Sequence, residues 1–202
     1  VFLFSAVDGV EPQSETNWRL ADNYKVPRMG FVNKMDRQGS DFLAVCNQIK
    51  EMLKSNAVPI VLPIGEEEDF KGIVDLVKNQ AIVWHEENMG STFDVVDIPD
   101  EMKSEVDKYR ANLIEAVAEY DDNLLEKFFE DPDSISEEEI HEALRKAAQD
   151  MSIIPMVCGS AFKNKGVQFL LDCVCRYLPS PEDKEAIVGT HPDDGSEISR
   201  KP

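Results

Sequence analysis

Four residues of the form N-K-x-D, Asn33-Lys34-Met35-Asp36, directly follow the apolar run 29–32. An aspartate carboxylate can accept two hydrogen bonds from guanine, one from the ring N–H and one from the exocyclic amine. Adenine offers no donor at either place, so the wrong base leaves an acceptor unpaired, at a cost of about 1–3 kcal/mol per lost bond. The Lys34 stem can lie along the base face, and the Asn33 amide can tie the loop to its neighbours. We interpret the motif as a guanine-recognition candidate, with a solvated turn as the alternative reading of so short a pattern.

A second segment, Gly159-Ser160-Ala161, follows another apolar run at 153–158. Small residues at the end of a strand let backbone N–H groups approach a ligand carbonyl closely. An acceptor at Asp36 and a backbone donor at Ala161 would read opposite features of guanine. The two segments together are therefore more specific than either one alone.

The elements that must position these residues follow from the apolar pattern. The pattern predicts three strand–helix units. Each pairs a buried strand with a helix: 1–7 with 12–24, 29–32 with 41–54, and 153–158 with 167–177. The inner face of the first helix is assigned to Trp18, Leu20 and Ala21. Repeated strand–helix units predict a parallel α/β sheet, whose ligands bind beyond the carboxyl ends of the strands. Residues 33–36 fall at such an end.

Between these units the pattern changes to short strand-like runs at 58–62, 72–76 and 80–84, which predict an antiparallel insertion. Residues 99–150 then read as helical, with apolar stripes at 113–118 and 124–129, and Ser136 with Glu139 predicts a capping box that starts the last helix. We expect an α/β domain formed by 1–56 and 151–181, interrupted by an acidic α+β insertion at 57–150. The polar tail 182–202 has no core of its own.

The charge balance and the apolar pattern exclude several classes of function. The chain has 202 residues and a net charge of −19, so autonomous nucleic-acid binding through phosphate neutralisation is excluded. No apolar run approaches the ~20 residues that span a bilayer, which predicts no membrane partner. The apolar start lacks the basic segment of a signal peptide and lacks Met, and we expect the chain to be a fragment that begins at a strand in mid-chain.

The cysteines and histidines do not suggest catalysis or metal binding. The four cysteines contain no C-x-x-C pair, and three of them lie within apolar runs, which predicts reduced, structural thiols and a cytoplasmic location. We expect the scattered histidines to face solvent or to pack against neighbours. These residues are Cys46, Cys158, Cys173 and Cys175, and His85, His141 and His191. The sequence predicts no catalytic residue and no metal ligand.

Longer ordered segments resemble the bacterial translation elongation factor G family. The resemblance covers almost the whole chain, and it is carried by residues 9–16, 26–28, 31–37, 62–65, 159–168 and 177–181. It implies a P-loop GTPase-type sheet and a parent GTPase that moves tRNA and mRNA through the ribosome, with GTP/GDP and Mg²⁺ as cofactors. Asn33, Lys34 and Asp36 would match the family's base-recognition motif, and Ser160 and Ala161 its second guanine-contacting segment. The insertion would match an extra subdomain that meets the ribosomal stalk protein.

The family's phosphate loop, G-x-x-x-x-G-K-[ST], and its γ-phosphate sensor are expected to precede the first strand of this chain. The chain alone is therefore predicted not to hydrolyse GTP, and the tail is expected to be a linker and the start of the following β-barrel domain. Two alternatives stay open. The parent could be a related ribosomal GTPase that acts in recycling or ribosome protection, or the chain could be an acidic stalk-binding module without a nucleotide function.

Overall fold

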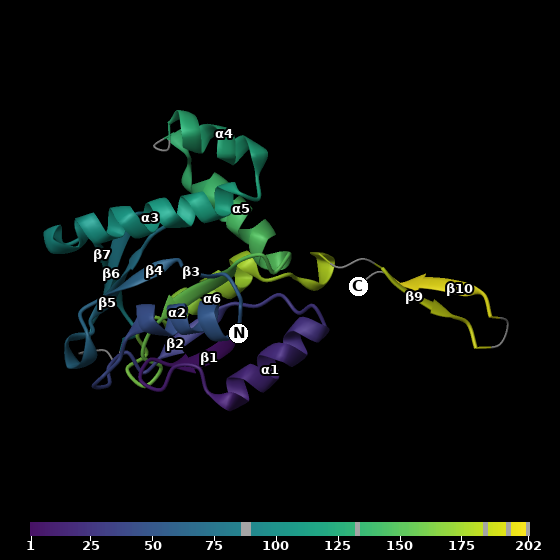
Figure 1. The fold of residues 1–202 in the computed structure, drawn as a ribbon, viewed down its shortest axis with the longest axis horizontal. Helices are drawn as coiled ribbons and strands as arrows, with labels where there is room; N and C mark the ends of the chain where they lie inside the picture. Colours follow the sequence, from purple (N-terminus) through teal and green to yellow (C-terminus); the bar gives the residue numbers. More distant parts are fainter. Residues whose placement is uncertain (86–89, 132–133, 184–185, 193–194, 201–202) are drawn as a thin grey trace.

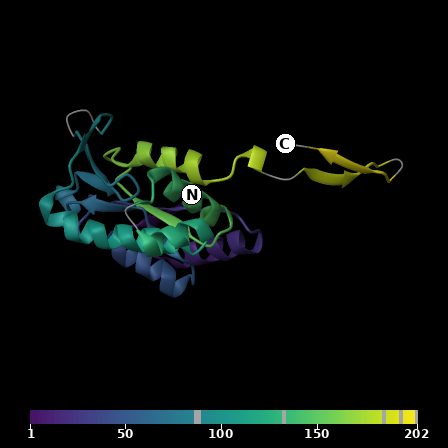
Figure 2. The ribbon, with the colours of Figure 1, turned by 90° about the horizontal axis from the view of Figure 1, so that it is seen from above.

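A four-stranded parallel sheet forms the centre of the computed structural model, which describes residues 1–85, 90–131, 134–183, 186–192 and 195–200 (Figure 1). Its strand order is β1-β2-β8-β3, and every neighbouring pair is parallel. The strands are β1 (Phe2–Ser5), β2 (Gly30–Asn33), β3 (Ala57–Pro59) and β8 (Ile154–Cys158). Its helices are α1 (Pro12–Asn23), α2 (Phe42–Met52) and α6 (Val167–Tyr177). Helix α6 lies on the opposite side of this sheet from α1 and α2 (Figure 2).

Local sequence signals explain why these helices begin where they do. Helix α1 has Pro12 in its first turn, where no N–H is needed. The carboxylate of Asp41 caps α2 by accepting a hydrogen bond from the Ala44 N–H at 2.8 Å. Trp18 fixes α1 on the sheet, since its side chain is buried and its ring contacts Phe2. Leu20 is 50% exposed, so its predicted place on the inner face is wrong.

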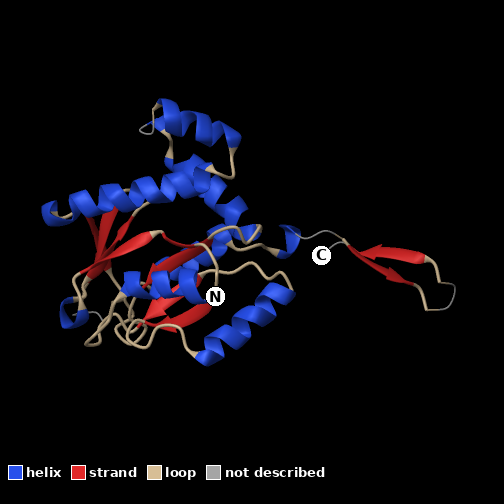
Figure 3. Cartoon of the chain, in the orientation of Figure 1, coloured by secondary structure: helices blue, strands red, loops and turns tan. Residues whose placement is uncertain are grey.

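A second sheet of four antiparallel strands lies in the insertion, in the order β4-β5-β6-β7 (Figure 3). Its strands are β4 (Val61–Ile64), β5 (Gly72–Asp75), β6 (Gln80–Trp84) and β7 (Phe93–Val96). Strand β7 was not predicted, because its side chains are exposed and carry no buried-strand pattern.

The expectation of one insertion strand at 58–62 is wrong, because the chain changes sheets within that run. Residues Ala57–Pro59 pair with β8 in the parallel sheet, and β4 pairs with β5. Ile60 joins the two sheets: its N–H donates to the Met156 carbonyl, and its carbonyl accepts from the Leu76 N–H. An uninterrupted apolar run carries no signal of this change, because both parts are buried. The antiparallel sheet therefore begins after residue 60, and not at the expected residue 58.

Three acidic helices cover the insertion: α3 (Lys103–Ala118), α4 (Asp122–Glu130) and α5 (Glu137–Gln149). The predicted capping box is confirmed, because Ser136 and Glu139 exchange side-chain and backbone hydrogen bonds. The stripe of α3 is buried at Leu113 and Val117. Phe129, which was assigned to the stripe of the next helix, is 77% exposed, because that short helix buries only part of its apolar face.

The last described residues form a hairpin of β9 (Ile187–Thr190) and β10 (Glu197–Arg200), which pair antiparallel. The hairpin extends away from the rest of the chain (Figures 1 and 2). Val188 is 58% exposed, in keeping with a tail that has no core of its own. Among the described residues, none of the helices has the length and apolar character needed to cross a bilayer.

Candidate functional site

The two segments that the sequence singled out lie side by side at the carboxyl edge of the parallel sheet. Strands β2 and β8 are neighbours, with Val32 opposite Cys158. Beyond the strands, the Gly159 N–H donates to the Val32 carbonyl at 3.0 Å, and the Met35 N–H donates to the Gly159 carbonyl at 3.1 Å. These bonds continue the contact of the strands into the loops, so the predicted juxtaposition is confirmed.

The Asn33 side chain links the two loops directly. Its Oδ1 accepts a hydrogen bond from the Ala161 N–H at 2.9 Å. The Asn33 amide thus ties the loop to its neighbour, as expected. The Ala161 N–H, however, was expected to face a base carbonyl, and here it is engaged by Asn33. A bound base would have to share this N–H or receive its hydrogen bond from the Asn33 amide nitrogen instead.

Lys34 reaches across to the loop that follows β1. Its backbone has a φ of 69°, in the left-handed region, and its Nζ lies 3.4 Å from Asp8 Oδ2. The Ser5 hydroxyl donates to the same Asp8 oxygen at 2.7 Å, and this bond, followed by that from Lys34, lowers the pKa of Asp8. Both members of the ion pair are 52% exposed, so the pair contributes little stability and serves to orient the lysine.

Asp36 is half-buried, and its carboxylate makes no hydrogen bond within the part of the chain that the structure describes. The loop around it is nevertheless fixed. Met35 is buried, the Ser40 hydroxyl donates to the Met35 carbonyl at 2.9 Å, and the Arg37 N–H donates to the Lys34 carbonyl at 3.1 Å. The site therefore presents a carboxylate acceptor on a fixed loop, which matches the chemistry expected of it.

The second segment is held by a small closed turn. Ser160 and Lys165 are both buried, and they exchange backbone hydrogen bonds of 2.9 and 3.0 Å. The Lys165 ammonium donates to the Phe70 carbonyl at 2.8 Å, which connects this turn to the insertion. Glycine is required at 159, because a Cβ there would lie 2.3 Å from the Lys165 carbonyl oxygen. Ser160 therefore has a structural role, and Ala161 is the exposed member of the pair.

Sequence reasoning missed Asp8 and Lys165, the two residues that support the site from other segments. Asp8 follows β1, so its position at a strand end was an available signal that we did not use. Lys165 gives no signal, because a lysine in a polar loop is ordinarily exposed, and the Phe70 carbonyl that accepts from its ammonium lies 95 residues away in the sequence.

Nucleophiles and metal ligands do not gather at these loops. All four cysteines are free, and burial raises the pKa of the Cys46, Cys158 and Cys173 thiols. Within the described ranges, no three His, Cys, Asp or Glu side chains form a group that could hold a metal ion. The arrangement can recognise a ligand, but it assigns no residue to a bond-breaking step.

Comparison with known proteins gives a consistent family match. Residues 1–180 match the family described as the elongation factor Tu GTP binding domain. The chain is 67% identical over 202 residues to elongation factor G of Cytophaga hutchinsonii and 57% identical over 202 residues to that of Amoebophilus asiaticus. These matches cover 100% of the chain but only 29% and 28% of the two relatives.

A solved crystal structure of a protein from Thermus thermophilus matches this chain with a TM-score of 0.79 at 27% identity. The match covers 98% of this chain and 30% of that one. The chain thus spans less than a third of the length of the proteins it matches.

Proposed function

The chain belongs to the family of elongation factor Tu GTP-binding domains, and on that premise we propose that the loops after β2 and β8 are the guanine-reading part of such a domain. The similarity to elongation factor G is confirmed over the full chain. The proposed guanine-contacting residues are Asn33, Lys34, Asp36, Ser160 and Ala161.

The free carboxylate of Asp36 is the observation that carries this proposal. The loop is fixed by bonds from its neighbours, while the carboxylate itself keeps its acceptor capacity. Two donors of guanine, N1–H and the 2-amine, match a carboxylate, and adenine has neither. The Asn33–Ala161 bond holds the second segment at the same edge, where the guanine carbonyl would lie.

Lys34 and Ser160 would support the base without reading it. The Lys34 ammonium is held at Asp8, so its aliphatic stem can cover one face of a base while its charge stays in solvent. Ser160 keeps the turn closed through its backbone, and its Oγ accepts from the Lys163 N–H at 3.2 Å. The base would therefore enter between two segments that are already ordered.

For the longer protein from which this segment would come, we infer GTP hydrolysis coupled to the movement of tRNA and mRNA on the ribosome, in the cytoplasm. The similarity to elongation factor G supports this inference, and a related ribosomal GTPase of recycling or ribosome protection is the alternative. GTP and GDP are the proposed ligands. The described residues contain no group of three His, Cys, Asp or Glu side chains that could hold Mg²⁺, so none of them is proposed as a ligand of this ion.

The proposed domain division is an α/β part at 1–56 and 151–181, an acidic insertion at 57–150, and a tail at 182–202. We add residues 57–59 to the α/β part, because they pair with β8. The β9–β10 hairpin is proposed as the start of a following β-barrel domain, since it projects from the remainder and buries little of its own surface.

A second candidate function belongs to the insertion. Residues 99–150 contain 17 Asp and Glu against 6 Lys and Arg, which favours a partner with a basic face, proposed to be the ribosomal stalk protein. Complementary charge accelerates encounter and is screened by salt. Stalk binding that weakens steeply with salt and ignores guanine nucleotides would support this function as independent of the base site.

Amide NMR of the 202-residue chain tests the guanine proposal. GDP should shift the amides of residues 33–36 and 159–161, ADP should not, and Asp36→Ala should abolish the GDP response. The Asp36→Ala spectrum elsewhere serves as the control for folding. A well-dispersed spectrum that does not respond to GDP would contradict a base site that is formed within this chain.

A further inference from the structure

One short turn of the insertion contacts both of the proposed guanine-reading loops. It consists of residues 65–71, which connect β4 to β5. In this turn, the Glu67 Oε1 accepts a hydrogen bond from the Gly39 N–H at 2.7 Å, in the loop after β2. The Phe70 carbonyl accepts from the Lys165 ammonium at 2.8 Å, in the loop after β8. Both loops are therefore connected to the same part of the insertion.

The 65–71 turn is itself firmly held. Phe70 is fully buried. Gly65 has a φ of 80°, and a Cβ there would lie 2.1 Å from the Asp69 carbonyl oxygen, so the chain closes tightly on itself. Glu67 has a φ of 52°, a left-handed conformation that a residue with a side chain rarely adopts unless its surroundings hold it there. The turn thus presents the Glu67 carboxylate to the neighbouring loop from a rigid support.

In the loop after β2, the bond to the turn lies close to the proposed base-reading carboxylate. Gly39 is three positions after Asp36, and residues 37–39 are exposed. A cavity of about 260 Å³ lies beside the loop, lined by Met35 from the loop and by Leu62 from β4. This space gives the loop room to move toward the insertion, and the hydrogen bond of the Gly39 N–H restrains that movement.

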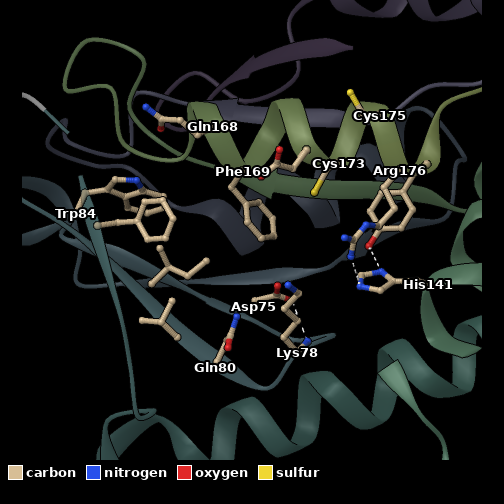
Figure 4. A pocket seen from close by; sticks show the side chains of 15 residues that line it. Asp75, Lys78, Gln80, Trp84, His141, Gln168, Phe169, Cys173, Cys175 and Arg176 are labelled. Atoms are coloured by element: carbon tan, nitrogen blue, oxygen red, sulfur yellow. Dashed lines mark hydrogen bonds between the residues drawn. The ribbon is translucent and has the colours of Figure 1, made fainter. Parts of the chain in front are cut away.

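The loop after β8 is connected to the same turn through a buried side chain. Lys165 is 1% exposed, and Ser160 exchanges backbone hydrogen bonds with it, so the bond to Phe70 also fixes the second guanine segment. A cavity of about 540 Å³ lies between the antiparallel sheet and helix α6, and Phe169 points into it (Figure 4). The sheet and α6 are therefore loosely packed there, and the bond from Lys165 gives the loop its direct connection to the insertion.

We propose that Glu67 is a positioning residue for the reading of guanine, an inference that rests on the proposed function of the two loops. By accepting from the Gly39 N–H, the Glu67 carboxylate sets the loop after β2 relative to the turn. The Lys165 ammonium sets the loop after β8 relative to the same turn. The Asp36 carboxylate is thereby held at the separation from the second loop that the edge of guanine requires. Glu67 acts through Gly39 and does not touch the base.

The preference for GDP over inosine diphosphate, measured by amide NMR titration of the 202-residue chain, tests this role. Inosine lacks the 2-amine that would donate to Asp36, so the wild-type chain should prefer GDP about tenfold, as expected for one unpaired acceptor. Glu67→Met and Glu67→Gln match in length and charge, but the glutamine keeps an acceptor for the Gly39 N–H. Glu67→Met should lower the preference to about twofold, because a displaced carboxylate bonds the 2-amine poorly, and Glu67→Gln should keep it.

Two further signals show that the variants report on this contact. The Gly39 amide proton should move upfield in Glu67→Met, where its acceptor is lost, and stay near its wild-type position in Glu67→Gln. Glu68→Met, at the exposed neighbouring position, is the matched control and should keep the wild-type preference. An unchanged Trp18 indole resonance shows that each variant is folded, and Glu67→Ala replaces Glu67→Met if the methionine disturbs that resonance.

The possible failures are distinguishable. A preference for GDP in Glu67→Met that equals that of the wild type overturns the role of Glu67 and leaves the proposed function of the loops standing. A Gly39 amide proton that does not move in this variant also overturns the role. A wild-type chain that binds both nucleotides equally overturns the proposed function of the loops and, with it, the role of Glu67.

Discussion

At the scale of single residues, Asn33 connects two loops that are 128 positions apart in the sequence. Beyond the last paired residues of β2 and β8, the Asn33 Oδ1 accepts the hydrogen bond of the Ala161 N–H in place of a backbone carbonyl. This bond positions Ala161 beside the N-K-x-D motif. The side chain therefore has a structural task before any base is bound.

We expect Asn33→Ala to lower the free energy of unfolding by about 1 kcal/mol, the usual contribution of one such hydrogen bond. The Ala161 amide should exchange with solvent faster in the variant, because its acceptor is gone. Chemical denaturation and hydrogen exchange measure the two effects. Exposed Gln38→Ala is the control, and protection of the Ala161 amide that equals the wild type would contradict the assigned role.

The residues of the site could be predicted only in part. Asn33 and Asp36 were proposed because their residue types suit guanine and follow an apolar run, and the structure places both in the loop after β2. The engagement of the Ala161 N–H by Asn33 was not foreseen, because it depends on the register of two distant loops. The support given by Asp8 and Lys165 depends in the same way on contacts between segments, which local patterns do not encode.

At the scale of elements, helix α5 shows how a short motif fixes a boundary. Glu139 accepts hydrogen bonds from the Ser136 N–H at 3.0 Å and from the Lys127 ammonium. The bond from Lys127 contributes most, followed by those from Ser136, and together they lower the pKa of Glu139 to about 2. The ionised carboxylate thus joins α4 to the start of α5.

Because the folded-state pKa of Glu139 is depressed, its contribution to stability is complete above the ordinary value of 4.5 and is lost as the pH falls toward about 2. Glu139→Gln should therefore destabilise the chain at neutral pH, and the difference from wild type should shrink between about pH 4.5 and pH 2. Urea unfolding over this range measures the difference. Glu138→Gln, on the same turn, should show little effect, and a difference for Glu139→Gln that does not vary with pH would contradict the ionic contribution.

The element pattern was predicted best where an element has one buried face. Helix α6 begins and ends at its predicted residues, and the strand and helix types of the α/β part are confirmed. The run at 58–62 was misjudged, because both of its halves are buried in different sheets. Strand β7 was missed for the opposite reason: its side chains are exposed, and only its pairing with β6 identifies it as a strand.

At the scale of the whole molecule, the chain combines the proposed site for a base with an acidic insertion and a net charge of −19. In the proposed function, the described residues recognise guanine, and none of them is assigned to phosphate or metal. We therefore expect this chain to bind guanine nucleotides without hydrolysing GTP.

We expect the 202-residue chain to release no phosphate from GTP above background, with or without Mg²⁺. The reason is that the printed sequence contains no G-x-x-x-x-G-K-[ST] loop to hold the phosphates. A phosphate-release assay measures this, with a complete GTPase as the positive control. Mg²⁺-dependent hydrolysis by the wild-type chain that is absent from Asp36→Ala would contradict this prediction. It would show that the chain also contains residues that act on the phosphates.

The base specificity of Asp36→Asn tests the central claim most directly. Xanthine has a carbonyl where guanine has its 2-amine, so an amide at position 36 would donate to xanthine and oppose guanine. Dissociation constants for guanosine and xanthosine diphosphate should favour the guanosine form in the wild-type chain and the xanthosine form in Asp36→Asn, each by about tenfold, as expected for one mismatched hydrogen bond. An unchanged ratio of the two constants in the variant would show that Asp36 does not read the base.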